Sequence, residues 1–293
     1  MPALSRKLKA YWDLTRLEHG LIYAVSFVVS LIIAYGMLPD PKVALAGAIA
    51  ATAAEMGAFA LNDYFDVEVD KKNNRTDRPI VRGEISKNEA LGLTIASFIV
   101  SVVAAYFIGN WGAFAVVVAM IIFGILYDYK LKEYGIVGNI YIAFTMAAPF
   151  LFSSMLFNNS PVLLLLTAMA FFLGLGREIM KGIMDVEGDA LRDVKTVARV
   201  FGEKTAKFTA VVLYVIAVLL APIPFLVNLV PTDPTYYHNL LYAAFAALAV
   251  LILLYVCGSL LLSHERKTIS KARKTTLMAM GIALIAFLLP ALL

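Results

Sequence analysis

Nine long apolar stretches limit what this chain can fold into. They cover approximately residues 20–38, 43–62, 90–108, 111–127, 136–157, 161–180, 208–230, 239–262 and 275–292. About 20 apolar residues in an α-helix cross the roughly 30 Å hydrocarbon core of a bilayer. A helix also satisfies its own backbone hydrogen bonds, which lipid cannot do. The sequence therefore predicts an all-α integral membrane protein with about nine transmembrane helices.

The composition excludes several other classes of protein. Hydrophobic residues make up 61% of the chain and charged residues 16%, whereas a soluble domain has about 45–50% and about 25%. Such a chain is too apolar to be disordered. Its single cysteine, Cys257, excludes a disulfide scaffold, and the scattered histidines show no spacing typical of zinc or haem ligands.

The basic residues predict the orientation in the membrane. All of the 25 Lys and Arg residues except Lys42 lie in the N-terminal segment or in alternate connections between the apolar stretches. Lys and Arg in short loops stay on the cytoplasmic side. We therefore expect a multi-pass protein of the cell membrane, in contact with membrane lipids, whose N-terminus is cytoplasmic. The net charge of +4 follows from this asymmetry, so no nucleic-acid partner is expected.

Acidic residues gather at the end of the second apolar stretch. Within LNDYFDVEVDKKNNRTDRP, helical spacing places Asn62, Asp63, Asp66 and Asp70 close to one face. Carboxylates at this spacing repel one another, and the repulsion grows near a low-dielectric bilayer. A cation that neutralises them would explain the arrangement.

A similar acidic cluster follows the sixth stretch. In GREIMKGIMDVEGDALRDVKT, Asp185, Asp189 and Asp193 lie at successive i,i+4 positions. We expect one membrane-embedded domain, residues 1–293, whose halves, about 1–135 and 136–293, each contain one cluster. Either cluster alone is also compatible with an ordinary solvated loop. Two clusters at matching helix ends favour a functional site.

The two clusters have the residues needed to bind a metal-diphosphate group. Carboxylate and amide oxygens suit Mg²⁺, which proteins bind together with substrate phosphates, so two or more ions are expected. Basic residues follow each cluster and can donate to phosphate oxygens. They are Arg75, Arg78 and Arg82 after the first, and Lys195 and Arg199 after the second.

Four segments of the chain resemble the UbiA superfamily of intramembrane prenyltransferases. NDYFDVEVD resembles its first acidic motif, NDxxDxxxD, and DVEGD resembles its second, DxxxD. RTDRPIVRGEIS is similar to the segment after the first motif, and LYDYKLKEYGIVGN to the family's tyrosine–lysine segment. Asp128 departs from the pattern, because many relatives have a serine there.

The resemblance implies helices around a central cavity and a Mg²⁺-dependent transfer reaction on the cytoplasmic side. A polyprenyl diphosphate, from geranyl to geranylgeranyl or longer, would ionise to an allylic carbocation that a lipophilic acceptor attacks. By matching positions, the metal ligands are Asn62, Asp66 and Asp70, with Asp63 supporting, and Asp185 and Asp189. The diphosphate contacts are Arg75, Arg78, Lys130 and Lys195.

Three further residues keep two interpretations each. Tyr127 is either a diphosphate donor and cation stabiliser or part of an interfacial aromatic belt. Glu55, two turns before Asn62, either orients or deprotonates the acceptor or is a packing residue. Arg16 either contacts the polar group of the acceptor or extends its charged end to the membrane surface.

The identity of the acceptor stays open at the level of sequence. The RLEHGLIYA and RTDRP segments favour an aromatic quinone precursor, and a geranylgeranylglyceryl phosphate acceptor is the nearest alternative. A transporter is the non-enzyme alternative. It is disfavoured because the acidic clusters lie at helix ends beside basic loops rather than along a path through the membrane.

Overall fold

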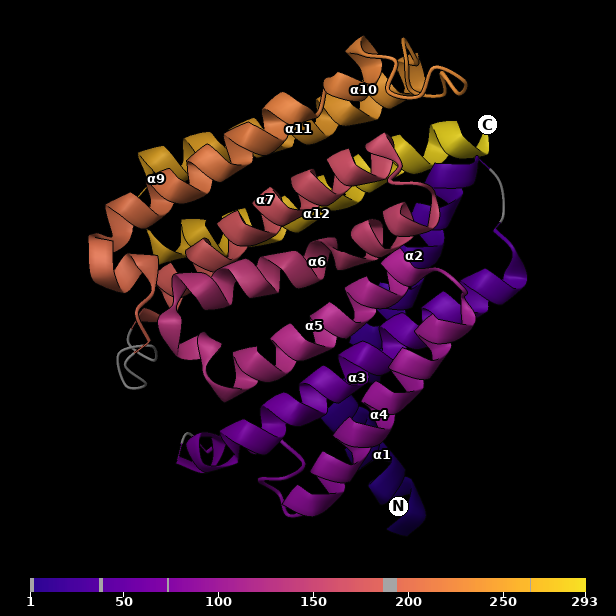
Figure 1. Ribbon diagram of the computed structural model, residues 1–293. Coiled ribbons are helices and arrows are strands. Elements are labelled where there is room, and N and C mark those ends of the chain that lie inside the picture. The colour runs from indigo at the N-terminus through magenta and orange to yellow at the C-terminus, as the bar shows by residue number, and fades with distance from the viewer. Residues whose placement is uncertain (1–2, 37–38, 73, 187–193, 264) are drawn as a thin grey trace. The chain divides into compact units, whose positions relative to one another are not determined.

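The protein is built from helices throughout the part that the structure describes, which comprises residues 3–36, 39–72, 74–186, 194–263 and 265–293 of a computed structural model (Figure 1). The helices in chain order are α1 (Ala3–Thr15), α2 (Leu17–Tyr35), α3 (Pro41–Lys72), α4 (Lys87–Phe107), α5 (Trp111–Tyr129), the short 3₁₀ helix η1 (Leu131–Tyr134), α6 (Ile136–Leu156), α7 (Pro161–Met184), α9 (Val197–Leu220), α10 (Ile223–Leu226), α11 (Leu240–Leu262) and α12 (Arg266–Leu292).

Nine helices within the described residues are long and apolar enough to cross a membrane, which confirms the number expected from the sequence. Three of them extend well beyond the apolar stretches. α3 continues to Lys72 instead of ending near residue 62, and α9 and α12 begin at Val197 and Arg266. Hydropathy marks only the part of a helix that lies in hydrocarbon, whereas backbone hydrogen bonding continues into the polar region.

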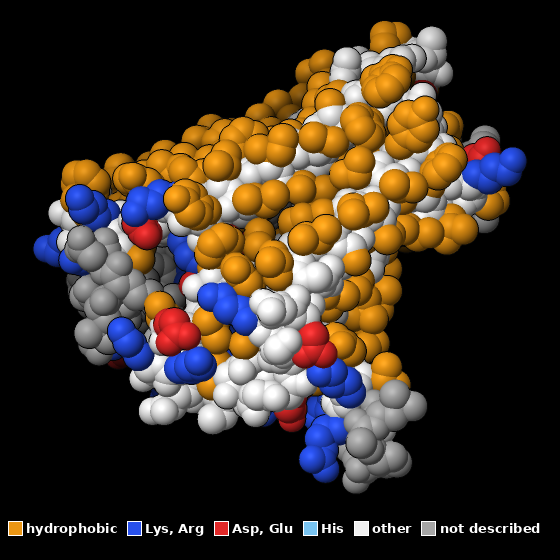
Figure 2. All heavy atoms as spheres, turned by 60° about the horizontal axis from the view of Figure 1, so that its bottom comes forward, with side chains coloured by type: hydrophobic (Ala, Val, Ile, Leu, Met, Phe, Trp, Pro, Cys, Tyr) orange, Lys and Arg blue, Asp and Glu red, His pale blue; other side chains and the backbone are white. Residues whose placement is uncertain are grey.

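The outer surface of the helices is apolar. Large hydrophobic side chains such as Phe107, Leu251 and Leu262 are well exposed, at 77%, 64% and 87%. Figure 2 shows hydrophobic side chains over broad areas of the surface in view, with the Lys, Arg, Asp and Glu side chains gathered in separate patches. Extensive exposed apolar surface is unfavourable in water but suits lipid. The protein is therefore a multi-pass membrane protein.

The chain forms two compact units, which are described separately. The first unit comprises residues 1–29 and 39–129, and the second comprises residues 30–38 and 130–293. In the first unit, α3 packs against α4 and α5, and α1 lies on α3. Glycines allow the close packing of α3. A Cβ atom on Gly47 would lie 2.0 Å from the Phe27 ring, and one on Gly57 would lie 2.5 Å from the Phe98 ring.

Local hydrogen bonds explain where α4 begins. The Ser86 hydroxyl accepts a hydrogen bond from the backbone N–H of Glu89 at 3.2 Å, and the Glu89 carboxylate accepts one from the Ser86 N–H at 2.7 Å. This reciprocal pair satisfies two backbone donors that the helix itself leaves free. The Lys7 ammonium lies 2.7 Å from the same carboxylate and so links α1 to the start of α4.

The second unit contains a four-helix bundle. α7 packs against α9, α9 against α11, α11 against α12, and α12 against α7, while α6 lies along α7 (Figure 1). Buried side chains of these helices form its core, including Leu173, Met180, Tyr214, Val256 and Ala279. Asp185, the first residue of the second acidic motif, caps α7 of this bundle.

Gly135 joins η1 to α6 at a very close backbone contact. Its φ of 52° lies in the left-handed region, and a Cβ atom there would lie 1.8 Å from the Lys195 carbonyl oxygen. The Lys195 N–H also donates to the Glu133 carbonyl oxygen at 3.5 Å. This contact places the segment after the second acidic motif against the η1–α6 turn.

We predict that Gly135→Ala destabilises the protein by at least about 2 kcal/mol, because alanine disfavours this φ and its methyl group would displace the Lys195 backbone. Thermal unfolding in detergent measures the effect. Gly92→Ala is the matched control, since no atom lies within 4 Å of the position of its Cβ. Equal unfolding temperatures for Gly135→Ala and the unsubstituted protein would contradict the close contact.

Candidate functional site

The first acidic motif lies within the last turns of α3. Since the helix continues to Lys72, Asn62, Asp63, Asp66 and Asp70 keep the helical spacing that the sequence predicts. Asp63 and Asp70 are buried, at 1% and 5% exposure, whereas Asn62 and Asp66 are partly exposed. This face of α3 therefore concentrates negative charge at the end of a membrane-spanning helix.

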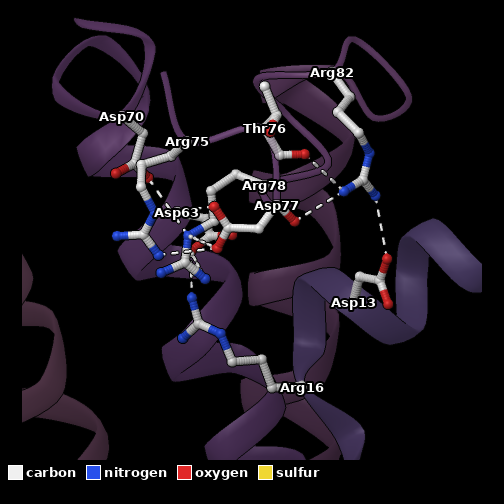
Figure 3. A network of polar contacts seen from close by, with 9 residues as sticks. All are labelled: Asp13, Arg16, Asp63, Asp70, Arg75, Thr76, Asp77, Arg78 and Arg82. Atoms are coloured by element: carbon white, nitrogen blue, oxygen red, sulfur yellow. Dashed lines mark hydrogen bonds and ion pairs between the residues drawn. The ribbon is translucent and has the colours of Figure 1, made fainter. Parts of the chain in front are cut away.

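Two arginines from different segments approach the buried Asp63 (Figure 3). Arg16 Nη2 lies 2.8 Å from Asp63 Oδ1, and Arg78 Nη1 lies 3.6 Å from the same oxygen. Arg16 sits between α1 and α2 with a positive φ of 44°, and its guanidinium lies 4.2 Å from the centre of the Phe59 ring. The ion pair offsets the cost of burying the Asp63 charge.

Arg78 lies among three carboxylates after the end of α3 (Figure 3). Besides Asp63, its Nε atom is 3.7 Å from Asp70 Oδ2 and 3.7 Å from Asp77 Oδ2. The neighbouring Arg75 donates two hydrogen bonds of 2.9 Å to Asp77 and lowers the pKa of that carboxyl group. The predicted diphosphate contacts Arg75 and Arg78 thus lie beside the acidic face.

Arg82 connects the same segment to α1. Its guanidinium lies 3.1 Å from Asp13 Oδ2 and donates to the carbonyl oxygens of Thr76 and Asp77 at 3.1 and 2.9 Å (Figure 3). These contacts shape the segment between α3 and α4. They also place α1 beside the segment that carries Arg75 and Arg78.

Asp128 is a site residue whose role the sequence left open. Its carboxylate is 4% exposed and accepts a hydrogen bond of 2.7 Å from the Asn62 side-chain amide. This bond links the end of α5 to the acidic face of α3 and orients Asn62. The only sequence signal was that Asp128 departs from the serine usual in the resembled segment.

The second acidic motif is described in part. Asp185 caps α7, is exposed, and donates its N–H to the Lys181 carbonyl oxygen at 3.0 Å. Asp189 and Asp193 lie outside the described residues. The Lys130 ammonium pairs with Glu133 at 2.5 Å, and the Glu133 carbonyl accepts from the Lys195 N–H. The segments that carry Lys130 and Lys195 are therefore adjacent in the second unit.

The remaining candidates lie on α3 and α5. Glu55 is partly buried on α3 and interacts electrostatically with Arg16, which also stacks on the intervening Phe59. Arg16 therefore lies near two carboxylates of α3. Tyr127 is partly buried near the end of α5, next to Asp128.

The donor set of the first motif fits Mg²⁺ completed by a substrate. Within the described part of the chain, no three acidic, histidine or cysteine side chains converge on a common point that could hold a metal ion. Asp63 Oδ2 is nevertheless buried and has no hydrogen-bond partner among the described residues. Mg²⁺ commonly takes one or two carboxylates and fills its other positions with phosphate oxygens and water. Asn62 and the aspartates of α3 offer such oxygens.

Comparisons with known proteins identify the family and the fold. The model of the UbiA prenyltransferase family matches residues 23–289. The chain is 47% identical over 289 residues to the digeranylgeranylglyceryl phosphate synthase of Archaeoglobus fulgidus, covering 98% of this chain and 97% of that protein.

Solved structures share the fold. A structure from work on digeranylgeranylglyceryl phosphate synthase in membranes has a TM-score of 0.85 and 28% identity, over 98% of this chain and 99% of that one. A UbiA homologue from Archaeoglobus fulgidus bound to GPP and Mg²⁺ has a TM-score of 0.68 and 20% identity, over 95% and 99%.

The chain belongs to the UbiA prenyltransferase family, as its acidic motifs suggested. It is accordingly a membrane-embedded prenyltransferase rather than a transporter.

We predict that Arg16→Met destabilises the protein by about 2–4 kcal/mol, because it leaves the buried Asp63 without its nearest cation. Unfolding in detergent measures the loss, and Asp63→Asn in the same background should restore part of it. Lys71→Met is the control. It breaks an exposed pair with Glu68 and should cost less than about 0.5 kcal/mol. Equal losses of stability for Arg16→Met and Lys71→Met would refute the stabilising role of the Arg16–Asp63 pair.

Proposed function

We propose that the enzyme transfers a geranylgeranyl group from its diphosphate to the free hydroxyl of geranylgeranylglyceryl phosphate. The observation that carries this proposal is the end-to-end similarity, at 47% identity, to a relative named digeranylgeranylglyceryl phosphate synthase. That name describes a product with two geranylgeranyl groups on glycerol phosphate. Of the two acceptors considered from the sequence, the comparisons thus favour glyceryl phosphate over an aromatic quinone precursor.

The reaction requires the allylic C–O bond to break and an ether bond to form. Diphosphate leaves with the bonding electrons, and the allylic carbocation is attacked by the glycerol oxygen, which then loses its proton. Bound Mg²⁺ would supply positive charge to the departing diphosphate oxygens. The expected ligands in the first unit are Asn62, Asp66 and Asp70.

The remaining groups of the first unit have distinct roles in this proposal. Arg75 and Arg78 lie beside the acidic face and donate hydrogen bonds to the diphosphate. Their positive charge stabilises the negative charge that develops on the diphosphate as it leaves. Asp128 orients Asn62 through their 2.7 Å hydrogen bond. Asp63 holds Arg16 and Arg78 in place. Asp185, Asp189, Lys130 and Lys195 of the second unit stay predictions from the family resemblance.

An apolar environment supports the same chemistry. Water would capture an allylic carbocation, so the reacting carbon must be kept in a water-poor site. Membrane-spanning helices rich in Ala, Gly and Leu provide such surroundings. The proposed site faces the cytoplasm, since the segments after α3 and α7 are rich in Lys and Arg.

We predict Mg²⁺-dependent diphosphate release when the purified enzyme receives geranylgeranyl diphosphate and geranylgeranylglyceryl phosphate. Mass spectrometry should identify the doubly prenylated product, and chelation of Mg²⁺ by EDTA should stop its formation. Aromatic quinone precursors serve as the competing acceptors. A prenylated aromatic product without any ether product would overturn the proposed acceptor.

We predict that Asp66→Ala lowers the rate of prenyl transfer at least about a hundredfold, because it removes an expected metal ligand. Glu68→Ala is the matched control, since this carboxylate lies two residues further on α3 with its side chain 73% exposed. Its activity should stay within about twofold of the unsubstituted enzyme. Thermal unfolding checks that both variants are folded. Full activity of a folded Asp66→Ala variant would exclude Asp66 from the site.

A further inference from the structure

Two arginines on neighbouring helices of the second unit have no role in the site described above. Arg177 lies on α7, seven residues before its end, and Arg273 lies on α12, seven residues after its start. α7 and α12 pack against each other in the four-helix bundle. The Arg273 side chain reaches across to α7, where its Nη1 atom lies 3.7 Å from the Met184 sulfur atom.

Neither arginine forms an ion pair with a carboxylate in the part of the chain that the structure describes. Among the described residues, Arg177 forms no hydrogen bond or ion pair, and Arg273 donates only to the Met184 sulfur atom, at 3.7 Å. The Nε atoms of both side chains are buried and unsatisfied. Glu178, the next residue, attracts the Arg177 charge but forms no ion pair with it, and its carboxylate lies 3.6 Å from the Lys181 ammonium.

Uncompensated positive charge inside a membrane protein is costly and points to an anionic ligand. Two guanidinium groups on adjacent helices can donate several hydrogen bonds to a tetrahedral phosphate. The Tyr214 hydroxyl lies in the same region, within 3.5 Å of the Thr276 hydroxyl, and adds a neutral polar group. The chemistry of this cluster is that of a phosphate site.

The depth of Arg177 in α7 favours a phosphate carried by a lipid. Arg177 precedes Asp185 by eight residues, or about 12 Å along the helix axis. An inorganic anion would have to leave water to reach this depth, whereas the apolar chains of a lipid phosphate favour the same position. The same distance separates Arg177 from the acidic motif, where the donor diphosphate is expected, whereas the Arg273 side chain reaches Met184 at the end of α7.

We propose that Arg177 and Arg273 bind the phosphate monoester of the acceptor lipid. This inference rests on the proposed function, because it requires an acceptor that carries a phosphate. The pair would hold the acceptor by its headgroup and so select glyceryl phosphates over acceptors without phosphate. Arg177 and Arg273 are then residues that determine specificity, distinct from those that contact the diphosphate.

The test compares Arg177→Gln and Arg273→Gln with the unsubstituted full-length enzyme, in detergent with Mg²⁺ and geranylgeranyl diphosphate. The acceptors are geranylgeranylglyceryl phosphate and geranylgeranylglycerol, which lacks the phosphate. Each substitution should raise the KM for the phosphate acceptor at least about tenfold and leave the KM for the diphosphate within about twofold. Rates with geranylgeranylglycerol should not change. Lys274→Gln is the control, because Lys274 is the exposed neighbour of Arg273.

A binding measurement separates this inference from the proposed function. Without Mg²⁺, geranylgeranylglyceryl phosphate should raise the Tm of the unsubstituted protein and of Lys274→Gln, but not that of either arginine variant. If the unsubstituted protein binds this lipid without prenylating it, the proposed function fails while the binding result still decides the role of the arginines.

Three results would overturn the inference. The first is an unchanged KM and Tm shift in both arginine variants. The second is a result that points to another role. A rise in the KM for the diphosphate would indicate a donor site. Equal losses of activity with both acceptors, together with a lower Tm in the absence of ligand, would indicate a structural role. The third is an equal Tm shift from inorganic phosphate at the same concentration, which would show that the site takes free phosphate.

Discussion

Compensation of charge at the ends of membrane-spanning helices is the constraint on which the rest of this structure depends. A carboxylate near hydrocarbon is unfavourable unless cations or hydrogen-bond donors compensate it. α3 carries three aspartates of the first motif, and Arg16 and Arg78 approach Asp63. Because these arginines come from the α1–α2 turn and from the segment after α3, the same ion pairs that offset the buried charge also hold those segments beside the site.

The two units have opposite charge imbalances within the described residues. The first concentrates carboxylates on α3, of which Asp63 keeps an unsatisfied oxygen, and the second contains two arginines without carboxylate partners. A divalent cation would stabilise the first arrangement and a phosphate the second. An enzyme that uses a metal-bound diphosphate and a phosphate-bearing acceptor needs both kinds of site, so the proposed function gives each imbalance a reason.

Much of the fold follows from local sequence, and much of the site does not. Hydropathy predicts the nine membrane-spanning helices of the described residues correctly, but it ends α3 too early and starts α9 and α12 too late, because it does not detect helix outside hydrocarbon. The i,i+4 spacing predicts the acidic face of α3, since helix geometry alone brings those residues together. The contacts Arg16–Asp63 and Asn62–Asp128 span 47 and 66 positions, so no local pattern indicates them.

The sequence by itself determined that the chain crosses a membrane, that its charged residues lie at helix ends, and that aspartates line one face of α3. Each of these properties depends on hydrophobicity or on the period of a single helix. Only the tertiary structure decided that Arg16 pairs with Asp63, that Asp128 orients Asn62, and that the helices carrying Arg177 and Arg273 pack against each other. Such pairings depend on how separate helices pack, and packing follows from the shapes and charges of many side chains together.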